Sequence, residues 1–248
     1  MNYKFLYILA ILAVGNSVFA ARIALNVVAT GRYIDYAHDM ITSARNHFCP
    51  GHEVHYFVYT DGSMEPADDV TVVFQKRLGW PYDTLMRFAM YLAHQELYEQ
   101  FDYIYATDAD MLFVSKVGNE ILSDRVATRH PGYTTHRGTY ETNKISKAYV
   151  APTEGQYYFA GGFYGGSHDE FFRMMETVVH NIELDFQKNF IAVWHDESHL
   201  NRYFIDNPPT KVLSPSYCYP QNAQNYPAIH HLKRKLVALD KNHKEVRK

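Results

Sequence analysis

Short apolar segments alternate with stretches of helical spacing in the first half of the chain, and this alternation limits the fold more than any other feature. Apolar runs that each predict a buried strand lie at residues 21–29, 54–59, 70–74 and 103–107. Residues 35–48 and 83–100 have helical spacing, and Asp83 is a candidate cap for the second helix. Alternating strands and helices predict an α/β fold, with a mostly parallel sheet covered by helices on both faces.

The second half of the chain gives fewer signals of regular structure. Residues 131–156 lack periodicity and are rich in Gly, Thr, His and Tyr, which predicts a long loop of functional importance or high mobility. Ser167 and Glu170 have the spacing of a capping box, so we expect a helix of about twenty residues to begin there. At 248 residues, the chain is long enough for one large domain or two small ones.

Composition excludes some function classes. Hydrophobic residues make up 47% of the chain and charged residues 21%, as in an ordinary globular protein. The net charge of −3 gives no reason to expect nucleic acid as a partner. Cys49 and Cys218 lie far apart and form no CxxC motif, so we expect two independent thiols.

The first twenty residues have the pattern of a targeting segment. Lys4 precedes an apolar run over residues 5–14, and the small residues Val18 and Ala20 follow. This pattern predicts a secretory signal peptide or signal anchor over residues 1–20, while a buried first strand or helix is the alternative. Either targeting role would make the protein secretory or membrane-associated, in a Golgi-like lumen or a bacterial envelope.

Asp108, Ala109 and Asp110 follow the strand predicted at 103–107. In extended backbone, residues two apart point to the same side, so the two carboxylates can bind one divalent cation. Oxygen ligands of this kind favour Mg²⁺ or Mn²⁺ over zinc. Aspartyl-nucleophile phosphatases also have Asp-x-Asp after a strand, but Leu112 stands where they need Thr or Val. Because Thr30 also follows a predicted strand, we expect Thr30 and Asp108 to face one cleft.

Residues 194–201 contain an indole, two imidazoles and two adjacent carboxylates. His195 and His199 are four apart, as in the zinc-protease helix, but that helix needs Glu directly after the first His. Here Asp196 has that place and Glu197 follows it, which weakens a zinc site. The remaining readings are a helix start whose His and Asp side chains satisfy each other, and a catalytic Glu197 with Trp194 and His195 framing the substrate.

Two further segments are ambiguous by themselves. Gly161 and Gly162 precede a second glycine pair, where the backbone either approaches a ligand closely or makes a tight turn between strands. Residues 231–248 contain seven Lys or Arg against two acids. This basic tail is either a solvated end or a segment that folds over a nucleotide diphosphate.

Taken together, these segments resemble glycosyltransferase family 6, which includes the histo-blood-group A and B transferases, α-1,3-galactosyltransferase and bacterial relatives. The matching segments lie at residues 108–110, 130–132, 157–166, 192–201, 209–215 and 241–243. Their order and spacing hold from about residue 22 to the end of the chain. Residues 79–81 and 84–88 are more similar to the bacterial members.

The resemblance implies a GT-A fold for residues 21–248, formed as a single catalytic domain. A Rossmann-like, UDP-binding half with a mixed sheet would span about residues 21–115, and an acceptor-binding half with a closing C-terminal tail about residues 116–248. The implied reaction transfers GalNAc or galactose from a UDP-sugar to a galactoside acceptor, including fucosylated galactosides, in α-1,3 linkage and with retention.

The resemblance also assigns roles to individual residues. Glu197 would be catalytic, and Asp108 and Asp110 would bind Mn²⁺ or Mg²⁺. The acceptor would contact His130, Thr139, Trp194 and His195. The donor nucleotide and its sugar would contact Val28, Ala29, Thr30, Tyr33, Arg87, Asp108, Ala109, Asp110, Ala160, Gly161, Gly162, Asp196, Lys241 and Arg247.

Particular residues refine these expectations. Some bacterial relatives have Asn-x-Asn and act without metal, but this chain retains both aspartates, so we expect metal dependence. Tyr219 and Pro220 stand where the blood-group enzymes have Trp-Asp, and Ala160 replaces a larger residue. Gly162 leaves room for an acetamido group, which favours GalNAc as the donor sugar. The alternatives are a catalytically inactive sugar-binding module and a metal-dependent hydrolase.

Overall fold

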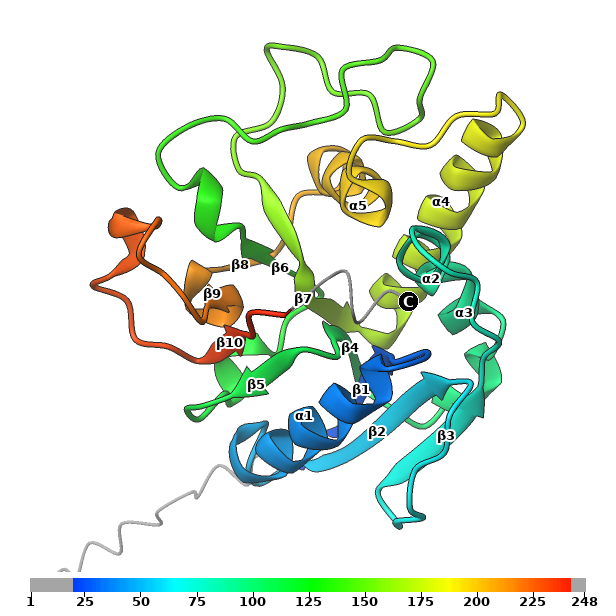
Figure 1. The fold of residues 1–248 in the computed structure, drawn as a ribbon, viewed down its shortest axis with the longest axis vertical. Helices are drawn as coiled ribbons and strands as arrows, with labels where there is room; N and C mark the ends of the chain where they lie inside the picture. Colours follow the sequence, from blue (N-terminus) through cyan, green and yellow to red (C-terminus); the bar gives the residue numbers. More distant parts are fainter. Residues whose placement is uncertain (1–19, 242–248) are drawn as a thin grey trace, which may run out of the picture.

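The computed structural model describes residues 20–241, and a seven-stranded mixed sheet forms the centre of the fold (Figure 1). The strand order is β3-β2-β1-β4-β7-β6-β8. The bounds are β1 Arg22–Val28, β2 Glu53–Thr60, β3 Val70–Phe74, β4 Tyr103–Asp108, β6 Arg125–Arg129, β7 Phe159–Ser167 and β8 Lys211–Leu213. The strands predicted from the apolar runs are confirmed, and the mixed sheet is that of the expected GT-A fold.

The register of the central strands places the site. β3, β2, β1 and β4 are parallel, and Val28 at the end of β1 lies opposite Asp108 at the end of β4. β7 is antiparallel to β4, with Thr107 opposite Phe163, so β7 begins at the edge where β1 and β4 end. Carboxyl ends of parallel strands are the usual place for a ligand in such sheets.

Helices cover both faces of the sheet, as the sequence predicts. Helix α1 (Tyr33–His47) buries its apolar side against one face, with Met40 and Ile41 in the core. On the other face lie α2 (Tyr82–Leu85), α3 (Arg87–Leu92), α4 (His168–Phe186) and α5 (His195–Asp206). Short 3₁₀ turns lie at Gln95–Tyr98, Asn119–Ile121, Pro131–Tyr133, Pro215–Cys218 and Pro227–Ile229.

A small second sheet brings the C-terminal part of the chain to the centre. It contains β5 (Met111–Phe113), β10 (Leu236–Ala238) and β9 (Tyr219–Pro220). β10 is antiparallel to β5, and the Leu239 N–H donates to the Asp110 carbonyl at 2.9 Å. This pairing brings the segment after β10 beside Asp110, and Figure 1 shows β10 next to β5.

Three sequence expectations are wrong in detail. The helix predicted at 83–100 is divided into α2, α3 and a 3₁₀ turn, and the Asp83 carboxylate accepts from the N–H groups of Leu78 and Gly79 instead of capping it. Ser167 occupies the N-cap position of α4, but its side chain makes no capping hydrogen bond. The second glycine pair lies within β7, so the tight turn between strands is also wrong.

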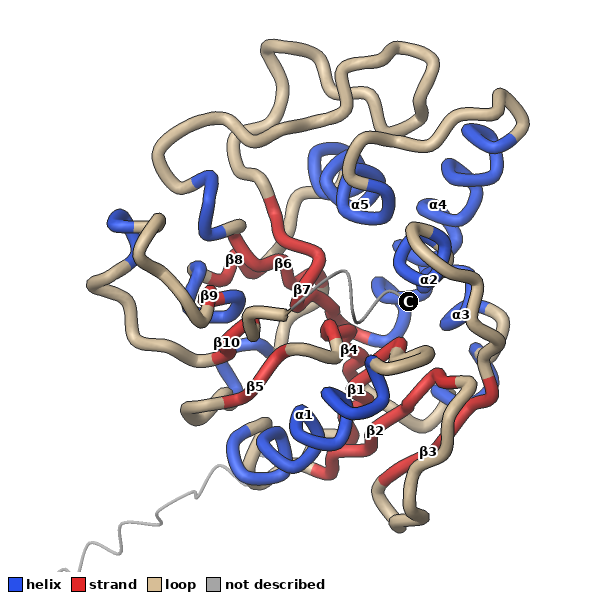
Figure 2. Tube along the Cα trace, viewed as in Figure 1, coloured by secondary structure: helices blue, strands red, loops and turns tan. Residues whose placement is uncertain are grey.

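Other expectations have simpler outcomes. The segment predicted as a long loop contains the 3₁₀ turn Pro131–Tyr133 and an isolated bridge between Glu141 and Tyr149, and Figure 2 shows it as an extended excursion. Cys49 and Cys218 are both free thiols, as predicted. Between residues 20 and 241, none of the helices has the length and apolarity that crossing a membrane requires. The targeting segment at residues 1–20 falls almost wholly outside the described residues.

Candidate active site

A cavity of about 250 Å³ lies at the edge where β1 and β4 end and β7 begins. It gathers most of the predicted site residues from six separate parts of the chain, and Thr30 and Asp108 share it as expected. The predicted residues that line it are Val28, Thr30, Tyr33, Arg87, Asp108, Ala109, Asp110, Gly161, Trp194, His195, Asp196, Glu197 and Lys241.

Several cavity residues were missed as site residues by the sequence reasoning. Arg77, Trp80, Asp83 and Thr84 come from the segment between β3 and α3. The Trp80 ring lies 4.8 Å from the His195 ring, measured between centroids, in an edge-on arrangement. Trp80 and Thr84 belong to stretches that match the bacterial relatives, which was a usable signal, but no pattern in the sequence pointed to Arg77.

The remaining predicted residues lie elsewhere. Ala29 and Ala160 are buried, and a Cβ added at Gly162 would lie 3.1 Å from the Cys218 sulfur and 3.6 Å from an Asp108 carboxylate oxygen. His130 accepts a hydrogen bond from the Gly132 N–H. The Thr139 hydroxyl bonds the Tyr133 hydroxyl at 2.8 Å, away from the cavity lining. Arg247 is outside the described residues.

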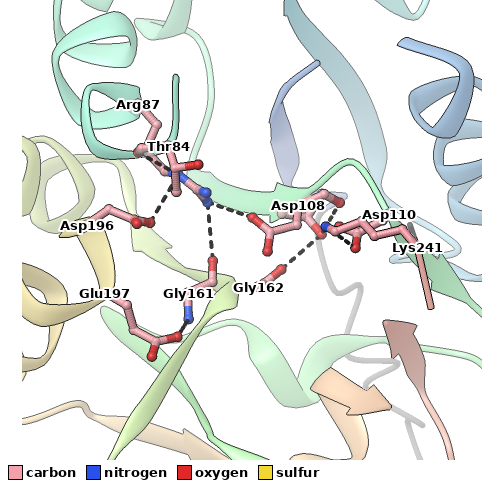
Figure 3. A network of polar contacts seen from close by, with 10 residues as sticks. Thr84, Arg87, Asp108, Asp110, Gly161, Gly162, Asp196, Glu197 and Lys241 are labelled. Atoms are coloured by element: carbon pink, nitrogen blue, oxygen red, sulfur yellow. Dashed lines mark hydrogen bonds and ion pairs between the residues drawn. The ribbon is translucent and has the colours of Figure 1, made fainter. Parts of the chain in front are cut away.

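Arg87 is the centre of the polar network in the cavity wall (Figure 3). Its side chain is only 9% exposed, and it bonds Asp108 at 2.8 Å and lies 3.3 Å from Asp196. A third contact joins its guanidinium to the Gly161 carbonyl at 3.4 Å. Burial opposes the charge, but Asp196 and Asp108 keep the pKa of Arg87 above its ordinary value. Arg87 therefore holds β4, β7 and α5 in one arrangement.

Asp196 and Glu197 stand in the first turn of α5, where the helix dipole favours negative charge. Burial raises the pKa of Asp196 to about 6, against the influence of Arg87. Burial likewise raises the pKa of Glu197 to about 7, against the Gly161 N–H, which donates to Oε2 at 2.8 Å. Two adjacent carboxyl groups are thus held at the cavity with pKa values well above those of exposed acids.

The start of α5 is fixed by specific hydrogen bonds. The Trp194 N–H donates to the Ser198 hydroxyl at 3.0 Å, and the Asn201 amide exchanges two hydrogen bonds of 2.8 Å with the Phe159 backbone. The Asn201 pair ties α5 to β7, and this sets Glu197 opposite Gly161. His199 is directed elsewhere, 3.6 Å from the buried Asp185 carboxylate. Asp196 pairs with Arg87, which comes from a different helix.

The glycines of β7 have two different uses. A Cβ at Gly165 would overlap the Ile104 carbonyl, and a Cβ at Gly166 would overlap the Asp124 carbonyl, so both are needed for close strand packing. A Cβ at Gly161 would instead lie 3.4 Å from an Asp196 oxygen and 3.7 Å from a Glu197 oxygen. The absent side chain at Gly161 therefore opens space directly in front of the two carboxyl groups.

The model of glycosyltransferase family 6 matches residues 7–248. The chain belongs to glycosyltransferase family 6. A family 6 relative, histo-blood group ABO system transferase 1 of Rattus norvegicus, is 37% identical over 242 residues, covering 91% of this chain and 68% of the relative.

Two other relatives extend the range of the family. Globoside alpha-1,3-N-acetylgalactosaminyltransferase 1 of Gallus gallus is 31% identical over 238 residues, covering 91% of this chain and 69% of the relative. The O-antigen biosynthesis glycosyltransferase WbnI of Escherichia coli is 28% identical over 202 residues, covering 78% and 86%. Family 6 membership makes the chain a glycosyltransferase, for which a nucleotide-sugar donor and a glycan acceptor are implied.

In this family 6 chain, two aspartates and a lysine meet at the cavity floor. Lys241 donates a hydrogen bond to Asp110, and its ammonium lies 5.0 Å from the Tyr33 ring centroid (Figure 3). Burial and, to a smaller extent, the neighbouring Asp108 raise the pKa of Asp110, whereas Lys241 acts to lower it. Paired carboxylates in a buried position are stabilised by a cation, and Lys241 provides one such charge.

The donor set fits a hard divalent cation. Asp108 and Asp110 offer carboxylate oxygens, the ligands that Mg²⁺ and Mn²⁺ prefer. Within residues 20–241, no three His, Cys, Asp or Glu side chains are grouped so that they could hold a metal ion. A cation bound by the two aspartates would therefore complete its coordination with oxygens from a diphosphate and water.

Proposed function

We propose that the protein is a retaining hexosyltransferase that moves GalNAc, or galactose, from a UDP-sugar to a galactoside in α-1,3 linkage. The observation that carries this proposal is the single cavity in which Arg87, Asp108, Asp196 and Glu197 meet. The family relatives support the sugar and linkage, because one of them is named an alpha-1,3-N-acetylgalactosaminyltransferase.

The cavity suggests how the donor would bind. UDP would lie against the end of β1, among Val28, Thr30 and Tyr33. Its diphosphate would approach Asp108 and Asp110, which would hold Mn²⁺ or Mg²⁺, while Lys241 and Arg247 would close over it. The hexose would then extend toward the open space at Gly161, where Asp196 can accept hydrogen bonds from its hydroxyl groups.

Glu197 would act at the anomeric carbon of the sugar. It would lie on the face opposite the departing UDP, where its carboxylate either attacks to form a glycosyl-enzyme or stabilises an oxocarbenium-like state by its charge. The metal, when bound, would neutralise charge on the leaving diphosphate. The acceptor would enter between Trp194 and His195, with His130 and Thr139 at the outer side.

The metal role of the two aspartates has a direct test. EDTA is expected to abolish transfer, and added Mn²⁺ is expected to restore it, because the diphosphate needs a divalent cation beside Asp108 and Asp110. Mn²⁺ affinity should be measured separately by isothermal titration in the presence of UDP, for the wild type and for Asp110→Asn. Full transfer in EDTA, or unchanged Mn²⁺ affinity in Asp110→Asn, would contradict this role.

The reaction itself is tested with a panel of substrates. The protein is mixed with UDP-GalNAc and UDP-Gal in competition, Mn²⁺ and an array of plain and fucosylated galactosides, and products are identified by mass spectrometry. We expect transfer, with GalNAc preferred because the donor-sugar region is lined by glycine. A clear galactose preference would overturn the donor assignment. Sugar binding without transfer would indicate an inactive sugar-binding module, and free sugar or phosphate without acceptor would indicate a hydrolase.

The placement of the enzyme in the cell is a further part of the proposal. We propose that residues 1–20 are a signal peptide or a short signal anchor and that residues 21–248 form one catalytic domain. The basic residue followed by a short apolar run supports this proposal.

A further inference from the structure

Tyr158, the residue before β7, buries a hydroxyl group that the site described above does not use. The residue is 2% exposed, and its hydroxyl oxygen has no hydrogen-bond partner among residues 20–241. A buried hydroxyl without a partner is unfavourable, because it has lost its hydrogen bonds to water and gained none in return. Such a group in a native fold calls for an explanation.

The ring of Tyr158 is held in place from several sides. Three aromatic rings surround it, with centroids at 4.8 Å for Tyr133, 5.0 Å for Tyr140 and 5.8 Å for His130. Gly138 packs so closely that a Cβ there would overlap the ring. The hydroxyl direction is therefore set by the packing, since the ring has little freedom to turn away.

Tyr158 lies beside the first turns of α5, because the next residue, Phe159, exchanges two hydrogen bonds of 2.8 Å with Asn201, one turn after Glu197. Burial raises the pKa of Tyr158, and the Glu197 carboxylate is the charged group that raises it most. In return, the Tyr158 hydroxyl lowers the pKa of Glu197, as the Gly161 N–H does. Glu197 accepts a hydrogen bond of 2.8 Å from the Gly161 N–H on Oε2, and the Tyr158 phenol acts on the same carboxyl group.

We propose that Tyr158 is a positioning residue that donates a hydrogen bond to Glu197 and fixes the direction of its carboxylate toward the donor sugar. The inference rests on the role proposed above for Glu197. The bond forms when the carboxylate is charged and the sugar occupies the space at Gly161. A hydrogen bond from a neutral donor to a charged acceptor is stronger than a hydrogen bond between two neutral groups. The charged Glu197 carboxylate would in this way provide the partner that the buried hydroxyl lacks.

The test removes the hydroxyl and retains the ring. In Tyr158→Phe, kcat is expected to fall roughly 10- to 100-fold, the effect of losing one hydrogen bond to a charged group. The donor KM and the affinity for UDP should change less than about threefold, because the nucleotide is bound at the other end of the cavity. Wild-type kcat in this variant would overturn the inference.

A matched control separates positioning from folding. Tyr203 on α5 also buries a hydroxyl without a partner among the described residues, but its charged neighbours are Glu170, Arg125 and Arg173. Tyr203→Phe should therefore retain wild-type kcat. If both variants lower kcat and the melting temperature alike, the hydroxyl of Tyr158 acts only in stability and the inference fails.

A double-mutant cycle with Glu197→Gln separates this inference from the proposed function. If Tyr158 acts through Glu197, adding Tyr158→Phe to Glu197→Gln should cause less than about a threefold further loss of the residual rate. A full additional loss in the double variant would overturn the inference. An active Glu197→Gln variant would overturn the proposed function, whereas an inactive one with a wild-type Tyr158→Phe would overturn only the role of Tyr158.

Discussion

Replacing Glu197 with glutamine is expected to lower the rate of sugar transfer by about three orders of magnitude while UDP still binds. Glutamine retains the shape of the side chain and an oxygen that can accept from the Gly161 N–H, so the cavity should be preserved. It removes the negative charge that the proposed mechanism places beside the reacting sugar carbon. Steady-state kinetics measure the loss, and isothermal titration with UDP and Mn²⁺ checks the binding.

The pH dependence of the wild type gives an independent view of the same group. Because burial raises the pKa of Glu197 to about 7, the carboxylate gains a proton as the pH falls through that value. We expect kcat/KM to decline below about pH 7, because protonation of Glu197 affects only the acid side of the pH profile. Glu99→Gln, a change at an exposed carboxyl, serves as the control. Unchanged turnover in Glu197→Gln would remove this residue from the mechanism.

Replacing Arg87 with methionine is expected to abolish transfer and to destabilise the fold. The variant leaves Asp196 buried with its main countercharge removed, and breaking a buried pair in this way costs about 3–5 kcal/mol. Thermal unfolding followed by circular dichroism measures the stability, and the transfer assay measures the activity. Arg87→Lys should recover part of the stability, but a single ammonium cannot replace the planar guanidinium that joins Asp108, Asp196 and Gly161.

An exposed ion pair provides the control for Arg87. Arg45 makes two hydrogen bonds to Asp69, at 2.8 and 2.6 Å, but this pair is open to solvent. Arg45→Met should therefore cost less than about 1 kcal/mol and leave transfer unchanged. A loss of stability in Arg87→Met no larger than in Arg45→Met would show that the buried network does not hold the site together.

The sequence predicted those parts of the fold that depend on local pattern. The buried runs became β1 to β4 and the 35–48 spacing became α1 because apolar periodicity reports directly which face is buried. The prediction of one helix over residues 83–100 was wrong because apolar periodicity does not indicate where a helix is interrupted. Met86 ends α2 and Arg87 begins α3, and the break lets Arg87 reach the cavity. The pairing of β5, β9 and β10 could not be predicted, since these strands have two or three residues each.

The candidate site was predictable where its residues follow strands or stand in one dense run. Thr30 and Asp108 follow from the rule that ligands bind at strand ends, and Glu197 from its neighbours in residues 194–201. Arg77 lies in a segment without regular structure, so no period or cap placed it in the cavity. Tyr158 was one tyrosine among 21, and only its burial next to Glu197 distinguishes it.

The pairing of β10 with β5 brings Lys241 to the lining of a cavity that is formed mainly by elements earlier in the sequence. All seven strands of the large sheet precede β10, and Lys241 reaches Asp110 only once β10 is in place. A chain shortened to residues 1–235 would therefore contain every strand of that sheet but lack the cation beside Asp110. The lining of the cavity is thus completed only by a residue that follows the whole large sheet in the sequence.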